Sequence, residues 1–80
     1  MIKVQLFAGL AEAIGHRTLE LPLNREITVE ELKQYLAHQY PNHKDRIDKC
    51  MVAVNQEYAD PDAPVSSQDE VVLIPPVSGG

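Results

Sequence analysis

Two glycines at the end of the chain, Gly79 and Gly80, are the residues with the clearest chemical potential. Glycine has no Cβ, so these residues could lie in a channel too narrow for any side chain. A terminal carboxylate has an ordinary pKa of about 3.5 and is an anion at neutral pH. Such an oxygen can attack the α-phosphate of a nucleotide and become an acyl-adenylate. We therefore expect Gly80 to react, although a frayed or truncated end would have the same composition.

The other candidate groups do not form a catalytic set. His16, His38 and His43 lack the spacing of metal ligands, and we expect them at the surface. Cys50 is expected to be a small packed residue, because nothing around it in the sequence would lower its pKa. The four glycines show no phosphate-binding spacing. We expect no metal and no bound cofactor, so another protein must activate a reactive terminus.

Composition limits the classes of partner. The 80 residues suffice for one domain, and seven basic against twelve acidic residues give a net charge of −5. This balance argues against binding to nucleic acid or to anionic membranes, and is compatible with a partner that has a basic docking surface. A single cysteine cannot form an internal disulfide, and the opening residues do not resemble a signal peptide. The expected location is the cytoplasm.

The first third of the chain reads as two strands around a short helical turn. Apolar residues alternate with other residues from position 2 to 7, which predicts a half-buried strand. A short helical turn is expected over residues 8–14, ended by Gly15. Leucines alternate again over residues 19–23, and Pro22 should place this second strand at a sheet edge.

The strongest local signal is the start of a helix. Thr28 followed three residues later by Glu31 is a capping box, in which each side chain satisfies a free backbone N–H. Pro41 should end the helix, because the residue before a proline is disfavoured in the α region. The sequence predicts a helix over residues 29–40. Its apolar stripe consists of Val29, Leu32, Leu36 and Tyr40.

The second half of the chain predicts further strands and an α+β domain. The final strand is a continuous apolar run, which suits a central position in a sheet. Strands around one helix in a chain of this length indicate one sheet with one helix packed on it. The expected segments are a polar stretch over 42–49, a strand over 51–54, a turn at 55–56, a short strand over 57–59, a loop over 60–68 and a last strand over 70–74.

Strand alternation also predicts which side chains face away from the helix. If Val71 and Leu73 point toward the helix, Val72 and Ile74 point to the other face of the sheet. The remaining candidates for that face are Phe7 and Tyr58. Scattered exposed apolar residues are ordinary, whereas a cluster next to the tail would be a docking patch. The adjoining tail favours the docking patch.

Three segments resemble the small subunit of molybdopterin synthase, a family of ubiquitin-like β-grasp sulfur carriers. These segments are residues 2–12, residues 53–55 and residues 69–80, of which the ending Ile-Pro-Pro-Val-Ser-Gly-Gly is the most specific. The resemblance covers the whole chain in length and in the order of its elements. It implies a mixed sheet packed on a main helix, with a β-grasp domain over residues 1–75 and a flexible Gly-Gly tail over residues 76–80.

The resemblance also implies a reaction cycle at Gly80. A ubiquitin-activating-like adenylyltransferase would use ATP and magnesium to adenylate the carboxylate, and a sulfur donor protein would convert it to a thiocarboxylate. The tail would then insert into the large synthase subunit and give its sulfur to cyclic pyranopterin monophosphate. The large subunit would supply the catalytic residues, in a heterotetramer of two small and two large chains.

Within this cycle the resemblance gives roles to the tail and to the patch. Tail insertion would involve Pro75, Pro76, Val77, Ser78 and Gly79, and partner binding would involve Phe7, Tyr58, Val72 and Ile74. The prolines would restrict the arm and reduce the entropy lost on insertion. Two alternatives stay open: a sulfur carrier for thiamine, tRNA thiolation or protein tagging, and a β-grasp interaction module that carries no sulfur.

Overall fold

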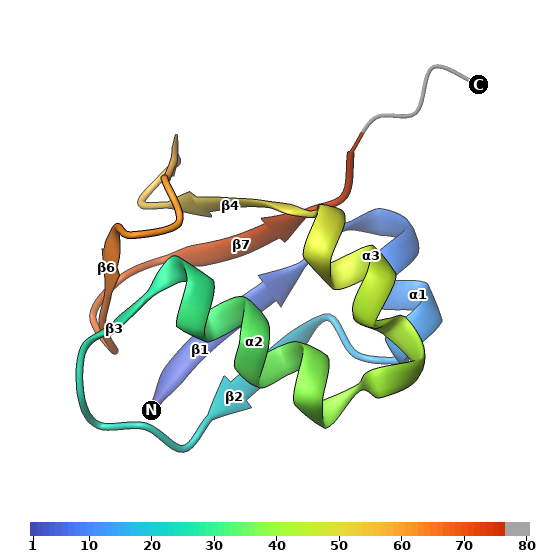
Figure 1. Cartoon of the computed structure of the whole chain (residues 1–80), viewed down its shortest axis with the longest axis horizontal. Coiled ribbons are helices and arrows are strands. Elements are labelled where there is room, and N and C mark those ends of the chain that lie inside the picture. Colours follow the sequence, from blue (N-terminus) through green and yellow to red (C-terminus); the bar gives the residue numbers. More distant parts are fainter. Residues whose placement is uncertain (77–80) are drawn as a thin grey trace.

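The computed structural model describes residues 1–76, and its centre is a mixed five-stranded sheet (Figure 1). The first and last strands, β1 and β7, pair in parallel, and the other pairs in this sheet are antiparallel. The last strand, β7, lies in the middle of the sheet, as its continuous apolar sequence predicted. The order across the sheet is β2 (Thr18–Leu21), β1 (Ile2–Leu6), β7 (Val71–Ile74), β4 (Met51–Val54) and β5 (Glu57–Tyr58).

The main helix, α2 (Val29–Gln39), begins with the predicted capping box. The Glu31 backbone N–H donates to Thr28 Oγ1 at 3.1 Å, and the Thr28 N–H donates to Glu31 Oε1 at 3.0 Å. The helix ends one residue earlier than predicted, with Tyr40 as its C-cap. The capping box is thus both the start signal and the bond pattern that satisfies the first free N–H groups.

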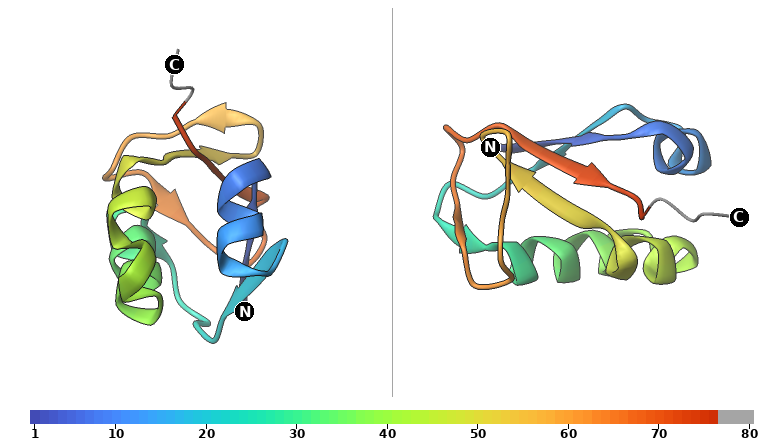
Figure 2. Two further views of the ribbon diagram at one scale, coloured as in Figure 1. Left: turned by 90° about the vertical axis from the view of Figure 1, so that its right-hand side faces the viewer. Right: turned by 90° about the horizontal axis from the view of Figure 1, so that it is seen from above.

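The hydrophobic core fills the space between the sheet and α2. Figure 2 shows from above that α2 runs along one side of the strands. Ile2, Val4, Val71 and Leu73 of the two central strands are at most 1% exposed, and Leu32 of α2 is fully buried. Burial of such side chains contributes about 1.5–3 kcal/mol each, as an upper estimate. The core therefore fixes which face of each strand turns away from the helix.

Two tight turns behave as the sequence predicted. The short helix α1 (Ala8–Ile14) ends at Gly15, whose φ of 89° is the left-handed conformation that glycine adopts without strain. Asn55 and Gln56 have φ values of 53° and 71° and connect β4 to β5. Positive φ at both central residues is the pattern of a type I′ hairpin turn, which matches the twist of the strands.

The polar stretch over residues 42–49 contains helical structure that the sequence did not predict. A 3₁₀ turn, η1 (Pro41–His43), leads into α3 (Lys44–Lys49), and Ile47 of this helix is 1% exposed. Lys33 of α2 donates from Nζ to the carbonyl oxygens of Asp48 at 2.8 Å and Cys50 at 2.9 Å. This ammonium therefore satisfies carbonyl groups at the end of α3 and joins the two helices.

Other boundaries also differ from the prediction: β5 ends one residue earlier than expected, at Tyr58, and β7 begins one residue later, at Val71. The expected loop over residues 60–68 contains β6 (Pro64–Val65), which pairs with β3 (Ile27–Thr28) in a separate two-stranded sheet. The second strand ends at Leu21, which pairs with Ile2, the first residue of β1. It does lie at the edge of the sheet, as predicted from Pro22.

Several predictions concern residues beyond this description. Val77, Ser78, Gly79 and Gly80 lie outside the described residues, and the division into a domain over residues 1–75 and a tail over 76–80 stays a prediction. Among residues 1–76, no helix has the length and apolar character needed to cross a membrane.

Candidate functional site

The candidate site lies on the face of the five-stranded sheet that turns away from α2. In β7, Val71 and Leu73 are buried against the core, whereas Val72 and Ile74 are only half-buried. This alternation places Val72 and Ile74 on the outer face, as predicted. The outer face is therefore where the strand that leads into the tail offers apolar side chains.

One row of side chains crosses this outer face at the level of Val72. The register pairs Gln5 with Val72, Val72 with Ala53, and Ala53 with Tyr58. Residues paired across neighbouring strands point to the same face. Ala53 is buried at 8% exposure between its neighbours, whereas Tyr58 is 67% exposed at the sheet edge. Tyr58 thus lies on the same face as Val72, as the sequence predicted, and at the same level across the sheet.

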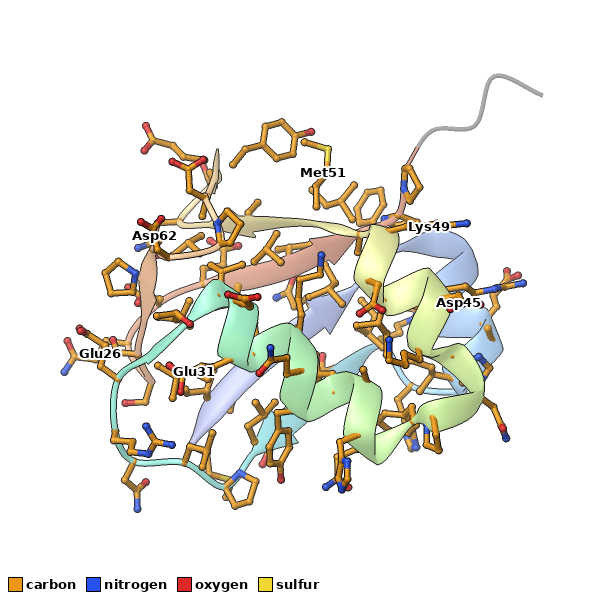
Figure 3. All side chains as sticks on the ribbon, viewed as in Figure 1. Glu26, Glu31, Asp45, Lys49, Met51 and Asp62 are labelled. Atoms are coloured by element: carbon orange, nitrogen blue, oxygen red, sulfur yellow. The ribbon has the colours of Figure 1, made fainter. Side chains whose placement is uncertain are left out.

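A second row crosses the outer face one pair closer to the tail. Met51 of β4 is paired with Ile74, and Leu6 with Leu73, so Phe7 continues β1 toward the level of Ile74. Phe7 keeps an extended backbone, with φ −107° and ψ 138°, and its side chain is 57% exposed. Met51 is 48% exposed, and Figure 3 shows its side chain beyond β4.

These two rows form a single cluster, which we call the apolar patch. Its members are Phe7, Met51, Tyr58, Val72 and Ile74. Sequence reasoning named four of them and missed Met51, although alternation with the buried Val52 could have identified its face. Large exposed apolar side chains that gather on one face commonly mark an interaction surface, whereas single scattered ones do not.

The apolar patch continues directly into the start of the tail. Ile74 belongs to the patch, Pro75 is half-buried and Pro76 is exposed. Proline fixes φ near −65° and lacks an N–H, so these residues cannot extend the central strand. A partner that covers the patch would therefore also contact the point where residues 77–80 begin.

Charged side chains are distributed unevenly around this site. Figure 3 shows Glu26, Glu31 and Asp62 at the end of the molecule where β3 and β6 pair. Asp45 and Lys49 of α3, which carry opposite charges, lie toward the end where β7 finishes. Acidic side chains thus lie at the end where β3 and β6 pair, and side chains of both signs lie on α3.

The titratable groups near the site do not form a catalytic centre. Cys50 is 4% exposed, its thiol donates to the Arg46 carbonyl at 3.1 Å, and burial raises its pKa. A protonated, enclosed thiol is a poor nucleophile. Within the described part of the chain, no three His, Cys, Asp or Glu side chains gather closely enough to hold a metal ion.

A shallow groove of about 920 Å³ lies beside the patch, between α2, α3 and the β4–β5 hairpin. Met51 and Tyr58 form part of its wall, together with Lys33 and Cys50. The ammonium of Lys33 and the thiol of Cys50 are already engaged in hydrogen bonds to backbone carbonyls. Lys33 thus joins α2 to the end of α3, and the Cys50 thiol bonds back to α3, so we place the site on the apolar patch.

The sheet order, the parallel central pair and the single long helix across one face define a ubiquitin-like β-grasp protein of the α+β class. The crystal structure of small archaeal modifier protein 1 from Haloferax volcanii has the same fold. It superimposes with a TM-score of 0.81 at 32% identity and covers 99% of this chain and 98% of its own. The predicted fold class is thereby confirmed.

Comparison of sequences then gives the family. The model of the ThiS family matches residues 4–80, and the chain belongs to this family. The molybdopterin synthase sulfur carrier subunit of Dictyostelium discoideum is 43% identical, over 98% of this chain and 94% of its own length. The subunit of the same name from Escherichia coli is 38% identical over the full length of both chains. The resemblance stated from the sequence is confirmed.

Proposed function

We propose that this chain is the sulfur carrier subunit of a molybdopterin synthase and serves molybdenum cofactor biosynthesis. The observation that carries the proposal is the 43% and 38% identity, over nearly whole chains, to proteins of that name. The apolar patch at the start of the tail supports it, because a carrier must dock on a partner while its terminus reaches the partner's reaction centre.

The reaction would begin at the Gly80 carboxylate. A ubiquitin-activating-like adenylyltransferase joins this carboxylate to AMP from ATP, with magnesium and with release of pyrophosphate. A sulfur donor protein then supplies sulfide, which displaces AMP and leaves a thiocarboxylate. Gly79 and Gly80 would keep the arm thin enough for a narrow channel. Adenylation is needed because a free carboxylate has no good leaving group.

Sulfur transfer would take place on the large subunit of the synthase. The apolar patch docks there, and Pro75 and Pro76 direct the tail toward bound cyclic pyranopterin monophosphate. Each thiocarboxylate would bond to the substrate through its sulfur, and water would then cleave the acyl–sulfur bond, which leaves the sulfur on the substrate and returns Gly80 to a carboxylate. Two such transfers build the dithiolene of molybdopterin. The assembly would hold two small and two large chains, and the catalytic side chains would belong to the large subunit.

The docking energy would come mainly from the exposed aromatic and thioether side chains. Phe7, Met51 and Tyr58 are 57%, 48% and 67% exposed, so each still has apolar surface to bury. Complete burial of such a side chain contributes about 1.5–3 kcal/mol, and partial burial contributes less. Restricting the arm with two prolines would further reduce the entropy lost on insertion.

A second candidate function is protein tagging. It is favoured by the similarity to small archaeal modifier protein 1, which is 33% identical over 95% of this chain. The same acyl-adenylate would then pass to a lysine amine and form an isopeptide bond, with release of AMP. The two functions share the activation step and differ in the group that attacks the activated Gly80.

The test is the intact mass of the chain after incubation with a cognate adenylyltransferase, ATP, magnesium and a sulfur source. A sulfur carrier gains the mass that corresponds to one oxygen replaced by sulfur, and a variant lacking Gly80 gains nothing. Adding the large subunit and cyclic pyranopterin monophosphate should return the original mass. Absence of the gain, with an enzyme that activates another carrier, would refute the proposal. Mass equal to a conjugate with a second protein would favour tagging.

A further inference from the structure

The turn between β4 and β5 has a backbone conformation that side chains rarely adopt. Asn55 and Gln56 have φ values of 53° and 71°, and neither residue is glycine. Asparagine is among the residues that best tolerate this region, whereas glutamine has no such advantage. A turn of this kind persists only where its surroundings hold it in place.

Asn55 provides that support through three hydrogen bonds to the two residues ahead of β7. Its backbone N–H donates to the Glu70 carbonyl at 2.7 Å, and its Oδ1 accepts from the Glu70 N–H at 2.9 Å. Its Nδ2 donates to Asp69 Oδ1 at 3.0 Å. The turn is therefore fastened to the loop that leads into the central strand.

Asp69 is itself held in place from the other side. Its Oδ2 accepts from the Ser66 backbone N–H at 2.8 Å and from Ser66 Oγ at 3.2 Å. The hydrogen bonds from Asn55 and Ser66 keep the pKa of Asp69 below its ordinary value, so this carboxylate is charged at neutral pH. Asn55 and Asp69 thus form a clamp between the hairpin turn and the start of β7.

The hairpin depends on this clamp because β5 is short and lies at the edge of the sheet. It contains only Glu57 and Tyr58, which pair with Val54 and Ala53 of β4. The Ala59 N–H also donates to the Val52 carbonyl at 2.9 Å. Tyr58 is 67% exposed, so packing of its own side chain contributes little to holding this strand.

We propose that Asn55 is a positioning residue for docking: the Asn55–Asp69 clamp holds the β4–β5 hairpin so that Tyr58 is fixed on the apolar patch before a partner arrives. The clamp lies at the start of β7, about 13 Å along the strand from Ile74. Asn55 acts through Tyr58, by reducing the ordering that binding would otherwise require. This inference rests on the proposed function, in which the partner is the large subunit of molybdopterin synthase.

Asn55→Gly is the sharpest variant, because glycine keeps the positive φ and removes only the side-chain bonds. In the free chain, we expect the Ala59 amide to exchange with deuterium about three- to tenfold faster, while the Leu6 amide at the opposite side of the sheet is unchanged. Affinity for the purified large subunit should fall about three- to tenfold. Asn42→Gly, an exposed substitution in η1, is the matched control and should change neither quantity.

A double variant separates the positioning of Tyr58 from the stability of the whole chain. In a Tyr58→Ala background, Asn55→Gly should cause no further loss of affinity, because the residue on which the clamp acts is gone.

A charge exchange tests the hydrogen bond itself. Asn55→Asp places two carboxylates together and should weaken docking. Asn55→Asp combined with Asp69→Asn exchanges the donor and the acceptor within the clamp and should restore the affinity for the large subunit.

The exchange and binding measurements test the positioning role and the proposed function separately. Unchanged Ala59 exchange in Asn55→Gly, or additive losses from Asn55→Gly and Tyr58→Ala, would overturn the positioning role. Failure of the wild-type chain to bind the large subunit would count against the proposed function instead. The exchange rate of Ala59, measured in the free chain, would still decide whether the clamp orders the hairpin.

Discussion

Met51 and Ile74 lie directly opposite one another across the antiparallel strands β4 and β7. Ile74 is the last strand residue before the tail, so Met51 brings an exposed thioether to the point where the tail begins. Methionine adapts its shape to irregular surfaces, which suits a side chain in a docking patch. This pair therefore places the apolar patch directly before Pro75 and Pro76, the last described residues of the chain.

Met51→Asp should abolish tight docking while leaving the fold intact. A carboxylate next to Ile74 would lose its hydration when the partner covers the patch, so we expect affinity for the large subunit to fall at least about tenfold. The free energy of unfolding in urea should change little, because Met51 is 48% exposed. Asn42→Asp adds the same charge outside the patch and serves as the control. Equal affinities for the two variants would place the docking surface elsewhere.

Thr28→Ala should destabilise the chain without affecting docking. It removes the hydroxyl that accepts from the Glu31 N–H at 3.1 Å, and loss of such a cap costs about 1 kcal/mol. Urea unfolding measures this cost, and Thr28→Ser should recover most of it. Since α2 covers the opposite face of the sheet from the patch, a large fall in affinity of folded Thr28→Ala for the large subunit would contradict this division of roles.

Asp69 should contribute to stability in a pH-dependent way. Its folded pKa is lowered, chiefly by the hydrogen bond from Asn55, whereas in the unfolded chain it returns to about 3.9. Its stabilising contribution is therefore fully present above about pH 4 and is lost as the pH falls through the lower folded pKa. The unfolding free energies of wild type and Asp69→Asn should converge as the pH falls from about 5 to about 2. A constant difference over this range would contradict the lowered pKa.

Cys50 should be nearly inert in the folded chain. Burial raises the pKa of its thiol, which lowers the thiolate fraction, and only 4% of the residue is exposed. We expect an aromatic disulfide reagent at pH 8 to react at least roughly tenfold more slowly with the folded chain than with the urea-unfolded chain. Equal rates in the two states would show that Cys50 is accessible.

The elements with a strong local pattern could be predicted from the sequence. The capping box of Thr28 and Glu31 and the apolar stripe of α2 identified the main helix to within one residue at its end. Strict alternation identified β1 and the faces of β7, because a strand's side chains point alternately to its two faces. Three of the five patch residues, Phe7, Val72 and Ile74, followed from that alternation, and Tyr58 was named as a further candidate for the same face.

The elements that depend on distant partners could not be predicted in this way. The helix α3 has six residues and only Ile47 is buried, so its sequence carries no helical stripe. The strand β6 is two residues long and exists because it pairs with β3, more than thirty positions earlier in the sequence. The Asn55–Asp69 clamp likewise joins two loops, which no local pattern indicates.

The parallel pairing of the first and last strands has a consequence for synthesis of the chain. Because β7 lies between β1 and β4, the sheet lacks its middle until residues 71–74 have left the ribosome. Pairing between such distant segments is also intrinsically slow. A nascent chain cut short before Val71 would therefore remain unfolded and open to proteases, instead of becoming a folded competitor that occupies the partner without a reactive end.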